Sequence, residues 1–304
     1  MRNVGAPTRL GIDFGGTKIA LGVVAEDGTV LQTWRLPTRI GDAAPAGLEG
    51  LLAAVQEVGD AYPSLAGIGV GICCQVDPAT GQIDGADATI PGWQSLDLAG
   101  RLAAATGLSV VMDNDANAAA LGEGWVGAAQ GLHDYIVLTI GTGVGGGIVA
   151  NGRLLTGAWG GAAELGHMPL DPNGPVCYCG SRGCLEQLIA GPALERTASR
   201  LGVSGAAELF DWAGTDEAAL RMVMQAGQWL AISTVLLVNI FQPQAVLYGG
   251  GVMHSAAPFW LPLVRSAVDS ATFPTNRRVR LLEAAPASAA GIVGAAALVG
   301  RNVT

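Results

Sequence analysis

Charged side chains are scarce in this sequence. Asp, Glu, Lys and Arg make up 13% of the 304 residues, against 50% that are hydrophobic. The 16 Lys and Arg are outnumbered by 25 Asp and Glu, so the net charge is −9. A nucleic-acid partner requires a basic surface that neutralises phosphates. The only basic cluster is Arg277, Arg278 and Arg280, and we therefore expect no nucleic-acid partner.

Long apolar runs are also missing. The N-terminal residues MRNVGAPTRLG contain no apolar signal core. The longest apolar run, residues 229–241, is interrupted by polar side chains and is too short to cross a bilayer. These absences predict a cytoplasmic protein with no membrane partner, in which cysteines stay reduced.

Histidine is rare too, and one of the three lies near most of the cysteines. His167 is followed by Cys177, Cys179 and Cys184, three of the five cysteines in the chain. One imidazole and three thiolates form a standard tetrahedral zinc site. The alternatives are idle thiols or a disulfide, which would leave one thiol over. Four protein ligands leave no position for an activating water, so the predicted zinc is structural.

Two stretches of the chain have the same pattern. Residues 10–38 and 134–156 each contain an apolar strand, a Gly/Thr turn, a second strand and a second tight turn. The chain is longer than one hydrophobic core usually covers. This internal duplication therefore predicts an α/β protein with two lobes.

The two Gly/Thr turns are candidate phosphate-binding turns. Glycine lets backbone N–H groups approach phosphate oxygens closely, and an aspartate beside such a turn suits Mg²⁺ held through water. Neither turn is a Walker or Rossmann motif, and ordinary hairpin turns are the alternative. Occurrence as a pair favours phosphate binding. The candidate residues are Asp13, Gly15, Gly16, Thr17, Lys18, Gly141, Thr142 and Gly143.

Polar residues crowd the turn at residues 113–117, where a strand ends and an Ala-rich helix begins. Capping of the helix explains one Asp or Asn, but this turn contains Asp113, Asn114, Asp115 and Asn117. The carboxyl ends of strands are where α/β folds keep their ligands. Asp115 is the candidate general base, and Asn114 could hold a substrate hydroxyl.

The rest of the chain alternates between helices and strands. A glycine triplet, Gly249–Gly251, follows the strand at 245–248 and would let a flat ligand such as adenine approach, although a simple turn is the alternative. Apolar residues occupy most faces of the helix at 216–240, which we expect to be buried. Further helices are expected at 46–61, 96–106, 185–201 with a break near Gly191-Pro192, and 287–298, and strands at 66–72 and 109–112.

Together these motifs resemble the ROK sugar kinases, which belong to the actin-like or hexokinase-type ATPases with a ribonuclease H-like fold. DFGGTK at 13–18 and GTGVGGG at 141–147 resemble the two phosphate motifs, and GGG at 249–251 the adenosine-side motif. GH at 166–167 with CYCGSRGCLE at 177–186 resembles the zinc and sugar motif. The resemblance covers nearly the whole chain.

The resemblance implies an ATP-dependent sugar kinase that phosphorylates a hexose hydroxyl, with glucose as the first candidate. It implies Asp115 as general base, sugar contacts from Asn114, Glu164, His167 and Glu186, and ATP, Mg²⁺ and structural zinc as cofactors. It also implies a smaller lobe of residues 1–115 with the helix in 287–304. The larger lobe, residues 116–286, would hold the zinc site and the dimerisation surface of a homodimer or homotetramer. The sequence itself shows no exposed interface stripe.

Two departures from the family pattern leave the sugar open. Cys73 and Cys74 stand where many relatives have Pro-Gly, and Thr89 stands where many have Asn before Pro-Gly-Trp. Both places lie near the sugar in the family, so Thr89 is a candidate substrate contact. An N-acetylhexosamine, either N-acetylmannosamine (ManNAc) or N-acetylglucosamine (GlcNAc), or another hexose is the alternative substrate. Cys73 and Cys74 could instead be merely small buried residues.

Two further alternatives concern the donor and the class of protein. Some relatives use polyphosphate, but 16 Lys and Arg are few for a long polyanion and favour ATP. Other members of the family are sugar-responsive transcription repressors, which carry an N-terminal helix-turn-helix. The first phosphate motif begins here at residue 13, so a sugar-sensing regulator without catalysis is the less favoured interpretation.

Overall fold

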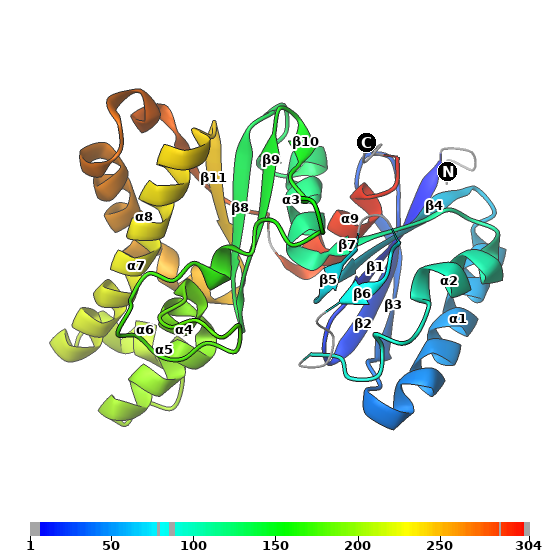
Figure 1. Cartoon of the computed structure of the whole chain (residues 1–304), viewed down its shortest axis with the longest axis horizontal. Helices are drawn as coiled ribbons and strands as arrows, with labels where there is room; N and C mark the ends of the chain where they lie inside the picture. The colour runs from blue at the N-terminus through cyan, green and yellow to red at the C-terminus, as the bar shows by residue number, and fades with distance from the viewer. Residues whose placement is uncertain (1–6, 78–79, 85–88, 286, 301–304) are drawn as a thin grey trace. The chain divides into compact units, whose positions relative to one another are not determined.

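The computed structural model describes residues 7–77, 80–84, 89–285 and 287–300. Its contacts divide the chain into two compact units (Figure 1). The first comprises Met1–Gln130, Leu154–Ala162 and Ser288–Thr304, and the second Gly131–Arg153 and Ala163–Ala287. Each unit has a hydrophobic core and a mixed β-sheet of its own, so the predicted α/β architecture is confirmed.

The sheet of the first unit has the strand order β3-β2-β1-β4-β7. An antiparallel meander of β1, β2 and β3 is extended by β4 and β7, which run parallel to β1. The carboxyl ends of β1, β4 and β7 therefore lie at one edge. The bounds are β1 (Thr8–Phe14), β2 (Lys18–Val24), β3 (Val30–Pro37), β4 (Leu65–Ile72) and β7 (Val110–Asn114), beside a short pair of β5 (Gln75–Val76) and β6 (Ile83–Asp84).

The sheet of the second unit repeats this plan, with the order β10-β9-β8-β11-β12. Here too the first two strands form an antiparallel hairpin, and β11 and β12 run parallel to β8. The duplication predicted from the hairpins thus extends to whole five-stranded sheets. The bounds are β8 (Tyr135–Ile140), β9 (Val144–Ala150), β10 (Arg153–Leu154), β11 (Ala245–Gly249) and β12 (Arg280–Glu283).

Most helices lie where the apolar periodicity predicted them. The break expected near Gly191-Pro192 separates α4 from α5. Helix α8 was not predicted, because Pro258 and Pro262 lie inside it, and interior prolines usually end a helix. Strands β3 and β12 and helix α6 were missed as well. The bounds are α1 (Ala44–Ala61), α2 (Leu98–Thr106), α3 (Asp115–Val126), α4 (Leu185–Ile189), α5 (Gly191–Ala198), α6 (Ala206–Ala213), α7 (Glu217–Phe241), α8 (Gly251–Ala271) and α9 (Ala287–Ala297).

Helix α3 lies in the first unit, whereas the boundary expected after residue 115 assigned it to the larger lobe. Ala118 and Leu121 of α3 pack against Ala297 and Leu298 at the end of α9. This contact joins segments that are far apart in the sequence, so no local signal marked it. The structural division therefore falls after Gln130.

Helix α9 lies directly on the backbone of the first sheet. A methyl group added at Gly69 of β4 would be 1.8 Å from the carbonyl oxygen of Ala295, and one at Gly11 of β1 would be 2.0 Å from that of Ile292. Only glycine allows backbone to approach backbone this closely. The glycines of β1 and β4 therefore set the position of α9 in the first unit.

Replacing Gly69 with Ala is expected to lower the free energy of unfolding by about 2–4 kcal/mol. The added methyl group has to displace helix backbone, which cannot rotate away as a side chain can. The matched control is Gly50→Ala on the exposed side of α1, where a methyl group meets nothing within 4 Å. We expect that control to be neutral or stabilising in urea denaturation, and equal losses for both variants would contradict the close approach.

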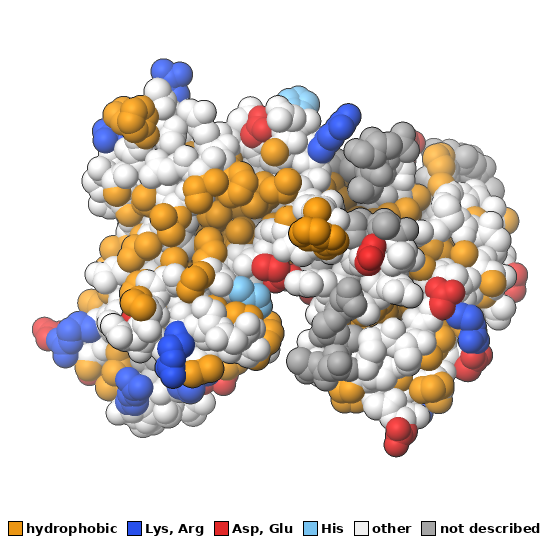
Figure 2. Space-filling view, in the orientation of Figure 1, with side chains coloured by type: hydrophobic (Ala, Val, Ile, Leu, Met, Phe, Trp, Pro, Cys, Tyr) orange, Lys and Arg blue, Asp and Glu red, His pale blue; other side chains and the backbone are white. Residues whose placement is uncertain are grey.

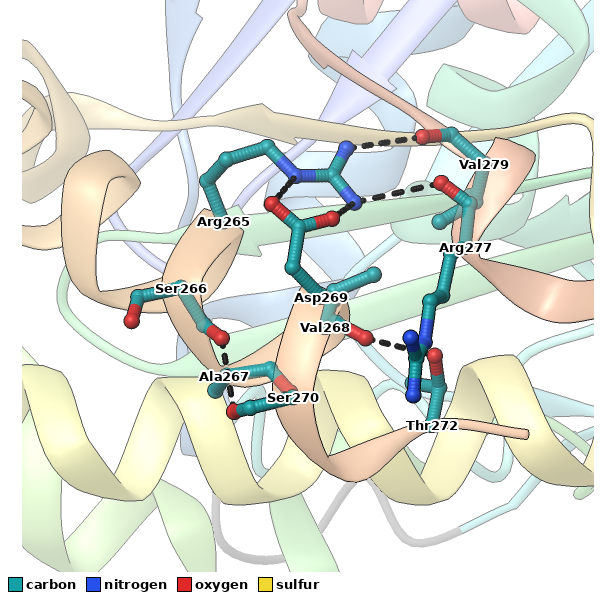
Figure 3. Close-up of polar contacts among 9 residues, drawn as sticks. All are labelled: Arg265, Ser266, Ala267, Val268, Asp269, Ser270, Thr272, Arg277 and Val279. Carbon is teal, nitrogen blue, oxygen red and sulfur yellow. Dashed lines mark hydrogen bonds and ion pairs between the residues drawn. The ribbon is translucent and has the colours of Figure 1, made fainter. Parts of the chain in front are cut away.

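The segment that contains Arg277 and Arg278 is bound through its backbone by Arg265, in the second unit (Figure 3). Arg265 of α8 binds both carboxylate oxygens of Asp269, at 3.2 and 2.8 Å. Its guanidinium also donates to the carbonyl oxygens of Val279 and Arg277, at 3.0 and 3.3 Å. Arg265 thereby holds the short 3₁₀ segment Pro274–Arg278 between α8 and β12.

Helix α7 is long and apolar enough to cross a membrane by length and composition alone. Half of its most apolar window is buried within the second unit, as expected of a core helix. The Trp260 indole of α8 donates to the carbonyl oxygen of Val223, at 2.9 Å. The packing of α7 against α8 therefore accounts for the buried part of its apolar surface.

Candidate active site and metal cluster

Two acidic residues lie at the carboxyl edge of the first sheet. Asp13 of β1 pairs with Gly71 of β4, and Gly71 pairs with Asp113 of β7. Burial raises the pKa of both carboxyl groups. The charge of Lys18 partly offsets this for Asp13, and hydrogen bonds from the Asn117 side chain and the Asn114 backbone do so for Asp113. The strand register thus places two carboxyl groups in one row across three strands.

In the turn at 113–117, one residue caps the helix that follows. Asn114 is the N-cap of α3, and its Oδ1 accepts from the backbone N–H of Ala116 at 2.9 Å. Asp113 Oδ1 accepts from the backbone N–H of Asn114 at 2.7 Å and from Asn117 Nδ2 at 2.8 Å. Asp115 follows as an exposed residue in the first turn of α3. Capping is met by Asn114, so it does not explain Asp115.

The two unusual cysteines adjoin this turn. Asn114 Nδ2 donates to the carbonyl oxygen of Cys74 at 3.3 Å. Cys74 is buried and Cys73 is half-buried, which agrees with the alternative that the two cysteines are small packing residues. The pKa of Cys73 is raised, first by its hydrogen bond to the Cys74 thiol and by burial, and further by the negative charge of Asp115. The pair therefore belongs to the surroundings of Asp115.

The first Gly/Thr turn is the β1–β2 hairpin loop, closed by a hydrogen bond from Gly15 N to Lys18 O of 3.0 Å. Thr38 braces this loop, because its Oγ1 donates to Gly15 O at 2.7 Å and its N–H to Thr17 O at 3.1 Å. Thr38 lies more than 20 residues away, and sequence reasoning missed it. A methyl group at Gly16 would be 3.5 Å from Thr89, so Thr89 lies beside this loop.

The second Gly/Thr turn is the β8–β9 loop, in which Gly141 N donates to Gly143 O at 2.9 Å. The glycine triplet adjoins it: Gly250 has a positive φ of 92°, and a methyl group there would be 2.3 Å from the carbonyl oxygen of Ile140. The fold thus brings two predicted nucleotide motifs of the second unit together. Thr142 is exposed at the tip of the loop.

The four predicted metal ligands converge in the second unit. Their ligand atoms all lie within 4.8 Å of one another. The Cys177 Sγ is 3.5 Å from His167 Nδ1, and the Cys179 Sγ is 3.6 Å from the Cys184 Sγ. Tetrahedral zinc places two sulfurs about 3.8 Å apart and a sulfur and a nitrogen about 3.6 Å apart. The cluster therefore fits a zinc ion, and its cysteines are free thiols.

Three further side chains surround this cluster. Nε2 of His167 is 3.0 Å from the Tyr178 hydroxyl and 4.0 Å from Glu164 Oε2. The Glu186 Oε2 on α4 accepts from the backbone N–H of Val144 at 3.1 Å. Tyr178 was missed, although it lies between two of the predicted cysteines. Glu186 contacts the second Gly/Thr turn, a contact no sequence pattern indicated.

The chain matches the ROK family over residues 9–302. It belongs to the ROK family. Among curated relatives, a glucokinase from Thermotoga maritima is 34% identical, over 97% of this chain and 98% of the relative. An N-acetylmannosamine kinase from Escherichia fergusonii is 33% identical, over 96% and 98%. The resemblance stated from the motifs is confirmed.

Solved structures of the family share the fold. A ROK hexokinase from Thermus thermophilus superposes with a TM-score of 0.84 at 36% identity, covering 96% of this chain and 97% of that one. A ROK glucokinase from Streptomyces griseus, solved in complex with glucose and AMPPNP, gives 0.78 at 32% identity, covering 96% and 99%. A ROK transcriptional regulator gives 0.85 at 25% identity, and this chain covers 78% of it.

Proposed function

We propose that this protein transfers a phosphoryl group from ATP to a hydroxyl of a hexose, with glucose as the first candidate. The observation that carries the proposal is Asp115, an exposed carboxylate in a turn whose capping is already met by Asn114. The named relatives point the same way, since they include glucokinases and a structure with glucose and AMPPNP. A non-catalytic regulator would not need this carboxylate.

Asp115 would accept the proton of the attacking hydroxyl as it bonds to the phosphorus. Such a base contributes about 10²–10⁴-fold to the rate, and the remainder comes from positioning and charge neutralisation. By the resemblance to the family, sugar hydroxyls would be contacted by Thr89, Asn114, Glu164, His167 and Glu186. The two Gly/Thr turns and Gly249–Gly251 would bind the nucleotide through backbone N–H groups.

Two metal ions belong to this proposal. Zinc, held by His167, Cys177, Cys179 and Cys184, would supply no chemistry, because its four positions are filled by protein. Its ligation through His167 Nδ1 would leave Nε2–H to donate to Tyr178 or Glu164, the usual second partner of a ligating histidine. Mg²⁺ neutralises phosphate charge when bound, and Asp13 suits it, since a single carboxylate is enough for an ion that keeps most of its waters.

The substrate and donor are tested by a coupled ADP-release assay with ATP and Mg²⁺ against hexoses and N-acetylhexosamines. Turnover on glucose is expected, and turnover on N-acetylmannosamine alone would favour the activity named for the Escherichia fergusonii relative. No turnover on any sugar would contradict the proposal. Polyphosphate is the second donor to test. On the face shown in Figure 2, the described Lys and Arg side chains lie in separate groups. The low count of 16 Lys and Arg favours ATP over a long polyanion.

We also propose a cytoplasmic homodimer. The helix at 216–240 was expected to be buried, but Ile232, Leu236 and Ile240 of α7 are 45%, 42% and 70% exposed. Their four-residue spacing puts them on one face. That face forms an exposed apolar stripe, which the sequence did not reveal because most faces of the helix are apolar.

Ile240→Glu is expected to shift the protein from dimer to monomer in light scattering, because a buried unpaired charge disfavours association. The control is Leu31→Glu on β3, another exposed apolar residue at 50% exposure, in the first unit. It should leave the mass unchanged. A dimer that persists in the Ile240 variant would place the interface elsewhere.

A further inference from the structure

We infer that the metal-binding loop holds the β8–β9 turn in place, so that the metal controls nucleotide affinity as well as sugar affinity. The predicted effect on nucleotide affinity rests on the proposed kinase function. The contacts between the loop and the turn do not depend on it. Both ends of the loop, Gly166-His167 and Cys184–Glu186, meet Val144, the first residue of β9, which directly follows the turn.

The carboxyl-terminal end of the loop binds the N–H group of Val144. Glu186 Oε2 accepts this hydrogen bond at 3.1 Å. A methyl group at Gly143 would lie 2.7 Å from the same oxygen, so a larger residue there would displace the Glu186 carboxylate. A bond to a charged acceptor is among the stronger hydrogen bonds of proteins. Glu186 is therefore a positioning residue for the turn.

The amino-terminal end of the loop packs on the carbonyl group of Val144. A methyl group at Gly166 would lie 2.0 Å from that carbonyl oxygen. Next to it, Leu165 fills the space above Gly146 of β9, where a methyl group would be 2.5 Å from the Leu165 side chain. The glycine of the GH pair thus lets the loop reach the strand backbone.

The metal cluster joins these two ends. His167 directly follows Gly166, and Cys184 is the N-cap of α4, two residues before Glu186. The Leu185 N–H donates to the carbonyl oxygen of Met168 at 3.0 Å, so the two segments already touch. One ion bound by His167 and Cys184 would lock them together around Val144. The start of α5 contributes as well, because Gly191 N donates to Gly141 O at 2.8 Å.

The consequence concerns the nucleotide. A phosphate-binding turn acts through backbone N–H groups whose direction is set by its φ and ψ angles. Loss of the ion would free both ends of the loop and release the N–H of Val144 from Glu186. The turn would then have to be ordered when the nucleotide binds, which lowers its affinity.

The first test is amide hydrogen exchange of the full chain with zinc loaded and with zinc stripped by a chelator. We expect the Val144 amide to exchange about 10-fold faster or more without zinc, while amides of the β1–β2 hairpin keep their rates. Those reference amides distinguish local release from unfolding. Equal protection of Val144 in both states would overturn the inference.

The second test measures AMPPNP binding by calorimetry without sugar, so that it does not depend on turnover. Kd is expected to rise about fivefold or more for stripped protein and for Glu186→Ala. Glu186→Gln retains a hydrogen-bond acceptor, so its Kd for AMPPNP should lie between those of wild type and Glu186→Ala. Gly166→Ala should also weaken binding, whereas Gly205→Ala, whose methyl group meets nothing within 4 Å, should not.

The two tests separate this inference from the proposed function. If wild type turns over no sugar but zinc removal still speeds exchange at Val144, the kinase proposal fails and the support of the turn stands. The opposite result is an active wild-type kinase in which zinc removal does not change exchange at Val144, and neither zinc removal nor Glu186→Ala changes the Kd for AMPPNP. In that case the kinase proposal stands and the inference is wrong.

Discussion

Replacing Asp115 with Asn is expected to lower the rate of sugar phosphorylation by about 10²–10⁴-fold, with little change in sugar affinity. The amide has the shape of the carboxylate but cannot accept the proton of the attacking hydroxyl. Because Asn114 caps α3, the substitution leaves the start of the helix intact. Coupled ADP release gives kcat, and calorimetry without nucleotide gives the sugar Kd.

The control for this experiment is Asp97→Asn in the same unit. Asp97 is exposed and caps α2, where its Oδ1 accepts from Gly100 N at 2.9 Å. Asn caps a helix as well as Asp does, so that variant should keep both turnover and affinity. If Asp115→Asn turns over sugar at the wild-type rate, Asp115 is not the base.

Replacing Cys179 with Ser is expected to abolish zinc binding and raise the KM for sugar about 10-fold or more. Cys179 is exposed, unlike Cys177 and Cys184, so its loss removes a ligand without opening a cavity. His167 would lose its fixed orientation toward Tyr178 and Glu164. Zinc content by a colorimetric chelator assay and KM at saturating ATP are the measurements.

Ser181→Ala in the same loop is the matched control. The backbone carbonyl of Ser181, which accepts from Cys177 N at 2.8 Å, stays in place in that variant, so zinc content and KM should match wild type. Full activity of a zinc-free Cys179→Ser protein would show that the metal does not position the sugar contacts.

Features carried by neighbouring residues could be predicted from the sequence. The ligand set of His167, Cys177, Cys179 and Cys184 was visible because soft ligands are rare in this chain, and the four side chains do converge. The two hairpins were visible because strand alternation and glycine turns are local. Most helices followed from apolar periodicity, with α8 missed because interior prolines oppose that pattern.

Contacts between distant segments could not be predicted in this way. Three features depend on how elements pack against one another in the folded chain. They are the packing of α9 on Gly11 and Gly69, the hydrogen bonds from Thr38 to the first turn, and the exposed stripe on α7. The division after Gln130 arose from contacts of α3 with a helix some 170 residues later along the chain. Nothing in the local composition encodes such a pairing.

The sequence by itself determined the family and picked out the candidate metal ligands and the candidate base, because each is a matter of side-chain chemistry within a short stretch. Only the tertiary structure decided how these parts support one another. Asn114 takes the capping role and leaves Asp115 exposed, and Glu186 and Gly166 meet at Val144. The physical reason is that hydrogen bonds and close packing act through space, between residues that the chain separates and folding brings together.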